Sequence, residues 1–496
     1  MLRELRGLAR ETAVYGLTTV LGRMLSFLLT PLFTHLLDRS ESGVVQTVYA
    51  AIAFMTVAYG LGLDTAYLRL GRRDGRADDD AFASAITGVV ATALAASILL
   101  HLFSAQAASA LGVPAELAVV VRYGAWILAL DAAMLMPYAE LRGSHRAATY
   151  GGVKLVTIAM NLVLAWLFVR RMGMGVQGVF LANLAASAAG LAMMAPVIAS
   201  RLQAPSGPGR PSATRLRSML SFGFPLVLAG IGSMVVQVAD RPLISRISGL
   251  AMAGLYGNCY KLGIFMMLLV GMFDQAWKPF VLERAERPDV DALIARALTY
   301  FAVAAAGTFL AVSFFVTAAV TAPIFLGKPL FHPAYWDGLV IVPVVTLGYL
   351  FNGLYFVMLA PLMIDKRTGA VGVATWAGAA VNIAANLILI PRYGMMGAAW
   401  ATCASYAVMA AAVWTLGRAT RAVPYEWGRL AAVGAWTAAL WLIGSRTGLG
   451  VRVLLICAYP AGLWFSGFMK AEELAELRSI FSARSSRAAP APEAGD

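Results

Sequence analysis

Long apolar stretches alternate with short polar segments along nearly the whole chain. A helix that crosses a membrane needs about 20 predominantly apolar residues, and fourteen stretches are long enough. They lie near residues 12–37, 43–66, 81–104, 117–139, 148–169, 176–199, 216–240, 250–276, 292–320, 337–362, 370–390, 395–417, 427–444 and 450–468. The pattern therefore predicts an all-α polytopic membrane protein with about 14 transmembrane helices.

Two segments of the chain repeat one plan. Residues 159–182 read AMNLVLAWLFVRRMGMGVQGVFLA, and residues 380–401 read AVNIAANLILIPRYGMMGAAWA. The matched pairs are Asn161 with Asn382, Arg171 with Arg392, Gly175 with Gly394 and Gly178 with Gly397. Such internal duplication in a membrane protein indicates a transporter whose halves move about a central site.

Composition excludes a soluble globule. The 496 residues are 60% hydrophobic and 13% charged, whereas soluble domains are about half apolar and about a quarter charged. The three cysteines sit singly in apolar stretches and the four histidines are scattered, so we expect no disulfide framework, metal site or cofactor. The net charge of +13 has no basic domain outside the apolar stretches, and nucleic-acid binding is not expected.

The lysines and arginines of the loops predict the orientation. With the amino terminus inside, 26 of the 39 fall on the cytoplasmic side, 9 on the other side and 4 within spans. The excess on one side predicts that both termini are cytoplasmic. The expected domains are a six-helix bundle at 1–200, a cytoplasmic linker at 201–217, a second six-helix bundle at 218–420, two additional transmembrane helices at 421–469, and a tail at 470–496 that is amphipathic and then disordered.

Five segments carry a family resemblance, in order along the chain. They are YGLTTVLGRMLSFLLTPLFTHLLDRSESG from Tyr15, GLGLDTAYLRL from Gly60, VADRPLISRISGLAMAGLYG from Val238, AWKPFVLE from Ala276 and NIAANLILIPRYGMMGAAWATCASY from Asn382. Together they resemble the polysaccharide transporter (Wzx-type) family of bacterial oligosaccharide flippases. The resemblance spans residues 12 to about 420, and the last two helices contribute little to it.

This resemblance implies a fold, a substrate and a location. The fold would be that of multidrug exporters and lipid II flippases (the MOP superfamily), with two pseudo-symmetric six-helix bundles around a central cavity and two extra C-terminal helices. The substrate would be a polyprenyl-diphosphate-linked oligosaccharide, moved without chemical change across the bacterial cytoplasmic (inner) membrane for O-antigen, capsule or exopolysaccharide biosynthesis. Expected partners are membrane lipids, a polysaccharide polymerase and a chain-length regulator. A lipid II flippase and a multidrug exporter are alternatives.

Three of the four cations within predicted spans point to an anionic substrate. Arg23 belongs to a polar stripe with Thr19 and Ser26, Lys261 follows Asn258 by about one turn, and Lys154 lies two turns into the fifth span. An unpaired charge at bilayer depth costs several kcal/mol, so we expect these six residues to line a hydrated cavity that binds the substrate.

The repeat strengthens the case for the cations. Alignment of the halves places Gly230 opposite Arg23, Ala50 opposite Lys261 and Thr375 opposite Lys154, so the cations are not part of the shared scaffold. The alternative is that each pairs with a buried acid or extends to the membrane surface.

Six further charged residues are candidates for gating or ion coupling. Asp64 and Arg69 could pair across the cytoplasmic mouth or simply flank a span. Asp240 and Arg241, expected near the outer surface, fit either a gate contact or an interfacial ion pair. Asp131 and Asp274 are carboxylates that could bind a proton or a sodium ion.

Overall fold

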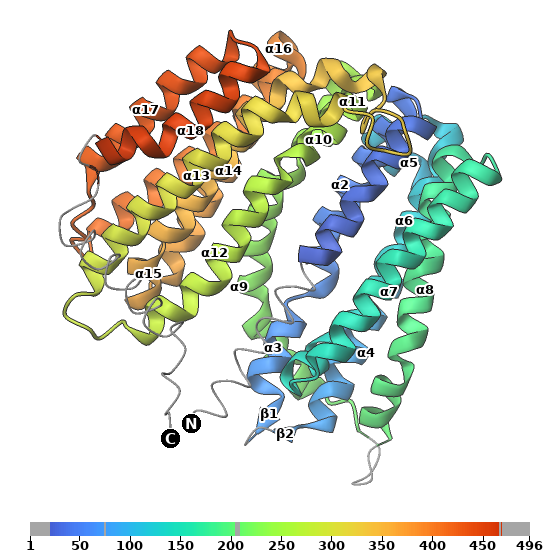
Figure 1. The fold of residues 1–496 in the computed structure, drawn as a ribbon. Coiled ribbons are helices and arrows are strands. Elements are labelled where there is room, and N and C mark those ends of the chain that lie inside the picture. The colour runs from blue at the N-terminus through green and yellow to red at the C-terminus, as the bar shows by residue number, and fades with distance from the viewer. Residues whose placement is uncertain (1–19, 74–75, 204–208, 466–467, 469–496) are drawn as a thin grey trace, which may run out of the picture.

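The computed structural model describes residues 20–73, 76–203, 209–465 and 468. Thr19, the whole predicted tail at 470–496 and the centre of the predicted linker lie outside this part of the chain. The described residues are almost entirely helical (Figure 1). The exception is a small antiparallel hairpin of β1 (Arg72–Arg73) and β2 (Arg76–Ala77).

The helices follow the predicted stretches closely. Those of the first half are Val20–Leu36, α2 Arg39–Gly60, α3 Leu63–Leu70, α4 Asp79–Leu102, α5 Ser104–Ala110, η1 Ala115–Leu117, α6 Ala118–Gly143, α7 Ala147–Ala165 with the π-helical turn η2 Trp166–Arg171, and α8 Gly175–Leu202. Those of the second half are α9 Ala213–Val238, α10 Asp240–Ser248, α11 Leu250–Tyr260, η3 Lys261–Gly263, α12 Ile264–Glu283, α13 Val290–Thr321, η4 Pro333–Ile341, α14 Val342–Met358, α15 Ala360–Ile364 and α16 Thr368–Arg418. Two further helices, α17 Trp427–Ser445 and α18 Leu449–Phe465, pack beside α13.

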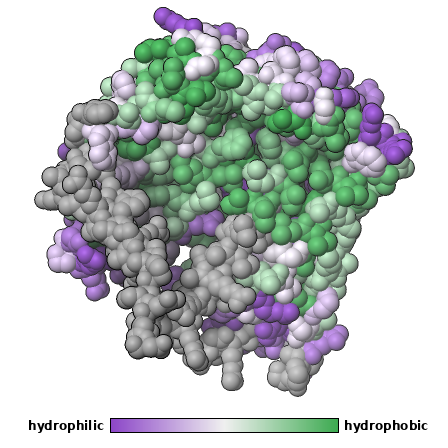
Figure 2. Space-filling model, viewed as in Figure 1, coloured by the Kyte–Doolittle hydropathy of each residue, from purple (hydrophilic) through white to green (hydrophobic). Residues whose placement is uncertain are grey.

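Ten helical segments of the described chain are long and apolar enough to cross a membrane. One of them, α16, contains two of the predicted stretches, because the helix is interrupted only at Gly394, which has φ +55° and ψ −131°. Apolar side chains form a broad band across the molecular face in Figure 2, and hydrophilic residues gather toward its two ends. The chain is therefore an all-α polytopic membrane protein.

The two repeated segments share an unusual backbone conformation at their turns. Gly175 before α8 has φ +52°, and its repeat partner Gly394 has φ +55°. Glycine adopts such angles without the steric cost that a Cβ imposes. At the partner pair further on, a Cβ on Gly397 would lie 2.3 Å from the Leu389 carbonyl oxygen, and one on Gly178 would lie 3.0 Å from the Met174 Cβ. Both glycines thus let a helix return closely onto the preceding segment.

Helices α2 and α11 join the halves at the end of the molecule opposite the β-hairpin (Figure 1). A Cβ on Gly43 would lie 1.9 Å from the Leu250 carbonyl oxygen, and one on Gly254 would lie 2.0 Å from that of Arg39. Beside this backbone contact, Gln46 Nε2 donates to the Asn258 side chain at 3.1 Å. We call this contact of α2 with α11 the outer seal, where outer denotes the end of the molecule away from the β-hairpin.

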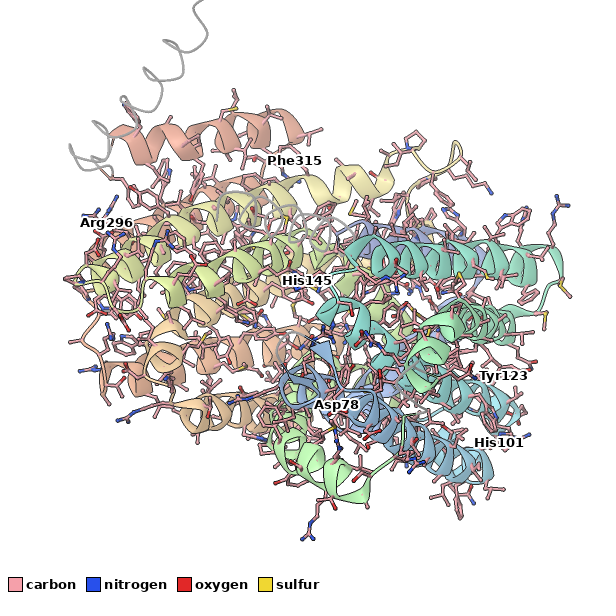
Figure 3. All side chains as sticks on the ribbon, turned by 90° about the horizontal axis from the view of Figure 1, so that it is seen from below. Asp78, His101, Tyr123, His145, Arg296 and Phe315 are labelled. Atoms are coloured by element: carbon pink, nitrogen blue, oxygen red, sulfur yellow. The ribbon has the colours of Figure 1, made fainter. Side chains whose placement is uncertain are left out.

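A second contact between the halves lies at the hairpin end, where α9 packs against α3 and α4. Here a Cβ on Gly223 would lie 2.5 Å from the Leu61 carbonyl oxygen, and one on Gly62 would lie 2.7 Å from that of Gly223. The ion pair between Arg215 and Asp78 fastens the start of α9 to the start of α4. Figure 3 views the molecule from this end.

The first half has one unpredicted break. The stretch expected as one helix at 43–66 is divided into α2 and α3, because Leu61 and Gly62 have φ of +51° and +65°.

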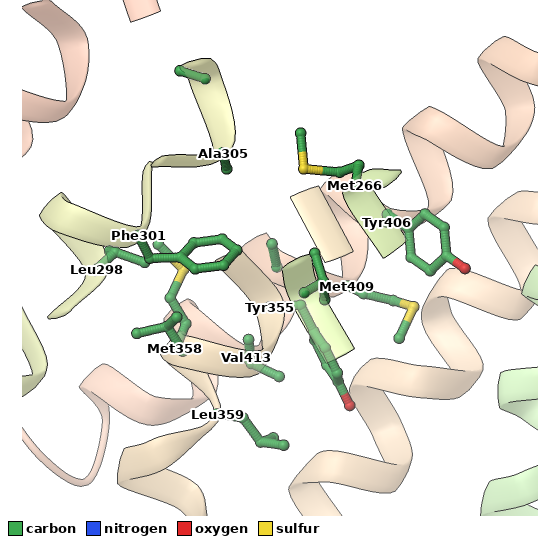
Figure 4. Packing of buried hydrophobic residues seen from close by; sticks show 14 of the residues in the cluster. Met266, Leu298, Phe301, Ala305, Tyr355, Met358, Leu359, Tyr406, Met409 and Val413 are labelled. Atoms are coloured by element: carbon green, nitrogen blue, oxygen red, sulfur yellow. The ribbon is translucent and has the colours of Figure 1, made fainter. Parts of the chain in front are cut away.

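The second half has a continuous apolar core of side chains such as Phe301, Met358 and Met409 between α13, α14 and α16 (Figure 4). These packed helices hold the cavity walls in place.

Candidate functional site

A cavity of about 600 Å³ lies between the two halves of the chain. Its walls come from Val20–Leu36, α2, α7 and α8 on one side and from α10, α11, η3, α12 and α14 on the other. The lining residues are Gly22, Arg23, Ser26, Phe27, Leu29, Phe33, Tyr49, Lys154, Ile158, Asn161, Asn183, Arg241, Tyr260, Lys261, Ile264, Met267 and Tyr349. We call it the cationic cavity, because four of these residues carry a positive charge.

Three of the four cations are those expected from the sequence. Arg23, Lys154 and Lys261 come from three helices far apart in sequence and line the same cavity. The Lys154 ammonium lies 5.6 Å from the centre of the Tyr150 ring, within the range of a cation–π contact. In the described part of the chain, none of the three forms an ion pair with a carboxylate. Ser26, another predicted residue, lies beside them.

Arg241 is the fourth cation, and the structure corrects its expected place. The sequence pattern suggested the outer surface, but only 11% of the Arg241 side chain is exposed and it lines the cationic cavity. Its guanidinium pairs with Asp240 at 3.0 Å and lies 4.4 Å from the centre of the Tyr260 ring. Asp240 is fully buried and also accepts a hydrogen bond from Tyr256. Arg241 is therefore a positioned cavity residue with one neutralising partner.

The charge of the cavity is strongly positive. Of the described residues that line it, four are cationic and none is acidic, and the Asp240 carboxylate paired with Arg241 offsets one of the charges. Uncharged polar groups from Asn161, Asn183 and Tyr349 complete the wall. Charges facing a low-dielectric protein and membrane interior interact more strongly than charges in bulk water, so the cavity is suited to an anion of more than one charge.

Asn258 does not line the cationic cavity, although the sequence pattern suggested that it would. The residue is fully buried in the outer seal, where its amide donates to Ser42 Oγ at 2.7 Å and accepts from Gln46. Both partners belong to α2, so Asn258 links the halves in this structure. Its expected contact with substrate stays a prediction that this conformation does not support.

The other predicted charges separate into different environments. Asp64 pairs with Arg142 at 3.1 Å, and Arg69 lies 5.1 Å from the centre of the Phe222 ring of α9. The suggested pairing of Asp64 with Arg69 is therefore not formed. Asp131, suggested as a carboxylate for ion coupling, accepts a hydrogen bond from Ser187 Oγ at 2.8 Å within the first half.

Asp274 lies in a separate hollow of the second half, where Lys278 pairs with it at 2.7 Å. No group of three or more histidine, cysteine or acidic residues capable of holding a metal ion occurs among the described residues. Sequence reasoning also missed cavity residues such as Tyr49, Asn183 and Tyr260. Polar residues on apolar helices were their only signal, and helices that pack together carry the same signal.

Comparison with solved structures shows the fold. The structure of "Lipid II flippase MurJ, inward closed conformation" matches with a TM-score of 0.74 and 15% identity, covering 92% of this chain and 98% of that one. An inward-facing multidrug resistance MATE family transporter of the MOP superfamily matches with a TM-score of 0.63 and 15% identity, covering 83% and 95%. The MATE multidrug transporter DinF-BH in complex with R6G matches with a TM-score of 0.59 and 16% identity, covering 84% and 96%. No curated protein sequence matches the chain significantly.

The family model for "Polysaccharide biosynthesis protein" matches residues 8–284, which is more than half of the chain. The match includes the helices that supply Arg23, Lys154, Lys261 and Arg241. The resemblance noted in the sequence is thus confirmed at the level of the family, and the fold agrees with it. The chain belongs to the polysaccharide biosynthesis protein family, and its fold is that of the MOP superfamily.

Proposed function

We propose that the chain is a flippase for a polyprenyl-diphosphate-linked oligosaccharide, which it moves from the cytoplasmic to the outer leaflet of the bacterial cytoplasmic membrane for surface polysaccharide biosynthesis. The observation that carries the proposal is the convergence of Arg23, Lys154, Lys261 and Arg241 on one cavity between the halves. A diphosphate is a compact anion with several charges and many acceptor oxygens. Arginine binds such oxygens through its planar fork of donors, and lysine as a point charge.

The electrostatic cost of the unpaired cations supports an anionic ligand. Each unpaired cation within the membrane costs several kcal/mol relative to water, and Arg23, Lys154 and Lys261 have no acidic partner among the described residues. Water in the cavity lowers this cost, and a diphosphate would replace that water with opposite charge. A cavity with this charge is unsuited to the organic cations that a multidrug exporter would carry.

The proposed mechanism is alternating access. In the proposed orientation the chain has fourteen spans and cytoplasmic termini, and the outer seal closes the cavity toward the outside. Residues 1–200 and 218–420 would rock as two bodies about the linker, with 421–469 and the tail at 470–496 attached to the second. The α2–α11 contact would open while the α9 contact with α3 and α4 stays closed, and would close when that contact opens, so that the head group meets each side in turn.

Reconstitution in proteoliposomes tests the function. The native protein is expected to move a fluorescent polyprenyl-diphosphate oligosaccharide between leaflets, and Arg23→Ala and Lys261→Ala are expected to slow transfer about tenfold or more, since a hydrogen bond to a charged group contributes about 1.5–3 kcal/mol. Arg287→Ala is the matched control, because it removes a cation that is exposed and paired with Asp289. Native rates in the Arg23 and Lys261 variants, with the proteins folded, would contradict the role of the cavity.

The same vesicles discriminate between the alternative functions. Transfer of lipid II in place of the oligosaccharide lipid would favour a lipid II flippase, which the similar fold permits. Export of an organic cation against a proton or sodium gradient, without lipid transfer, would favour a multidrug exporter. Imposing each gradient in turn also tests coupling, for which Asp131 and Asp274 are the proposed carboxylates. Cooperation with a polymerase and a chain-length regulator remains part of the proposal.

A further inference from the structure

A second hollow, of about 420 Å³, lies within the second half of the chain. It is bounded by α9, α12, α14 and α16, with Arg23 of the first helix at its edge. Its lining residues are Arg23, Ala229, Ser233, Val236, Gln237, Met267, Val270, Gly271, Asp274, Gln275, Tyr349, Asn352, Tyr355, Phe356, Val371, Thr375, Tyr406 and Met409. We call it the neutral hollow, since its polar side chains are mostly amides and hydroxyls.

The polar groups of the neutral hollow are only partly used within the protein. One carboxylate oxygen of Asp274 accepts a hydrogen bond from the Lys278 ammonium at 2.7 Å. The other oxygen, Oδ1, is buried with no hydrogen-bond partner in the described chain. The side-chain amides of Gln275 and Asn352 form no hydrogen bond with a described residue. A buried polar atom without a partner costs about 1–3 kcal/mol, and this applies to Asp274 Oδ1. Asn352 is half-buried and Gln275 is exposed, so their amides are free to bond to a ligand rich in hydrogen-bonding atoms.

Aromatic side chains line the same hollow. Tyr349, Tyr355, Phe356 and Tyr406 contribute rings from α14 and α16, and the packed core of Figure 4 holds Tyr355 and Tyr406 in position. Planar rings give apolar faces to the C–H groups of a sugar, and amide and carboxylate groups bond to its hydroxyls. The combination of uncharged polar groups with rigid rings is therefore suited to a carbohydrate.

The neutral hollow adjoins the cationic cavity. Arg23, Met267 and Tyr349 line both spaces. The Arg23 guanidinium lies 3.7 Å from the position that a Cβ on Gly271 would occupy, so it rests against α12 between the two spaces. A ligand that places an anionic group on Arg23 could thus continue directly into the neutral hollow.

We propose that the neutral hollow is the glycan subsite of the transporter, in which the sugar next to the diphosphate is held by Gln237, Asn352 and Asp274 against the tyrosine rings. This inference rests on the proposed function and extends it, because it divides the substrate between two adjoining spaces. The diphosphate lies on the cations, and the carbohydrate lies in the second half of the chain. An organic cation is a poorer occupant, since Lys278 already neutralises Asp274.

Binding of lipids with and without sugar tests the division. The probes are bare polyprenyl diphosphate and the same lipid carrying glucose, galactose or N-acetylglucosamine, titrated into the purified protein in nanodiscs. We expect at least one glycosylated probe to bind the native protein about fivefold or more tightly than the bare lipid, because a few additional hydrogen bonds form. Asn352→Ala and Gln237→Ala should remove this gain and leave the affinity for the bare lipid unchanged.

Two controls separate the subsites. Arg23→Ala is expected to weaken all probes together, because every probe carries the diphosphate, and Gln203→Ala changes an exposed amide outside both spaces and should change nothing. The glycan subsite is overturned if no sugar strengthens binding to the native protein, or if the gain survives in the Asn352 and Gln237 variants. Failure of the native protein to bind even the bare lipid would instead refute the proposed function.

Discussion

Substitution of Gly254 by alanine tests whether the outer seal controls access to the cavity. The added Cβ would lie 2.0 Å from the Arg39 carbonyl oxygen of α2 and 2.7 Å from the Gly43 nitrogen. Carbon and oxygen atoms of neighbouring helices normally approach no closer than about 3.3–3.6 Å. The two helices must therefore separate by more than 1 Å at this point, while α11 itself is favoured by about 1 kcal/mol because alanine is a better helix former than glycine.

The magnitude follows from the cost of overpacking, about 1–3 kcal/mol. If the closed state bears this cost and the open state does not, the population of the open state rises about 5- to 150-fold. A suitable probe is Ser42→Cys, because Ser42 is fully buried in the outer seal, where its hydroxyl accepts a hydrogen bond from Asn258. The native thiols Cys259, Cys403 and Cys457 are replaced beforehand.

The assay is the labelling rate of this thiol by a membrane-impermeant maleimide added outside cells. We expect faster labelling in the Gly254→Ala protein, in proportion to its open fraction. Gly434→Ala serves as the control, since a Cβ there meets no atom within 4 Å. Unchanged labelling in a Gly254→Ala protein that remains folded would refute the reasoning, because the helices would then have absorbed the added group without parting.

Two further predictions concern stability. Partial burial raises the pKa of Asp78, but hydrogen bonds from Arg215 and from backbone amides, with the charge of Arg215, outweigh this and hold the pKa below its ordinary value. Ionised Asp78 thus contributes at most about 1 kcal/mol at neutral pH, which is lost progressively as the pH falls below about 4. The melting-temperature difference between native and Asp78→Asn protein should be present at pH 7 and shrink as the pH falls below about 4, and a constant difference would contradict this. Gly175→Ala and Gly394→Ala should each destabilise the protein by about 1–3 kcal/mol, because their positive φ disfavours a Cβ, whereas Gly434→Ala should not; equal melting temperatures would show that the turns adapt.

The sequence predicted which residues lie within membrane spans better than it predicted which side of a helix they occupy. Long apolar stretches located the helices, and the lack of a repeat partner distinguished Arg23, Lys154 and Lys261, which the structure brings to one cavity. Asn258 has the same depth and spacing signal as Lys261, yet it faces α2. Helix α11 is apolar on nearly all sides, so its hydrophobic pattern does not indicate which side faces a partner helix.

The sequence pattern did not predict contacts between segments far apart in the chain. Arg241 looked like a surface residue because it follows a span, but α10 continues the helix and places the side chain over Tyr260. Asp64 pairs with Arg142, which is 78 positions away. The break at Leu61 and Gly62 was also missed, because glycines in an apolar stretch are common in membrane helices.

For the proposed flippase, the glycine contacts between the halves have a consequence for how its substrate range can diversify. At both ends of the molecule the halves touch through backbone, at Gly43 and Gly254 on one side and at Gly62 and Gly223 on the other. These backbone contacts lie outside the proposed glycan subsite, so a substitution there should impair the transport of every glycan to the same degree. Changes in the neutral hollow should alter which glycan is carried. New substrate preferences could therefore arise through changes in the neutral hollow, while the glycine contacts between the halves stay unchanged.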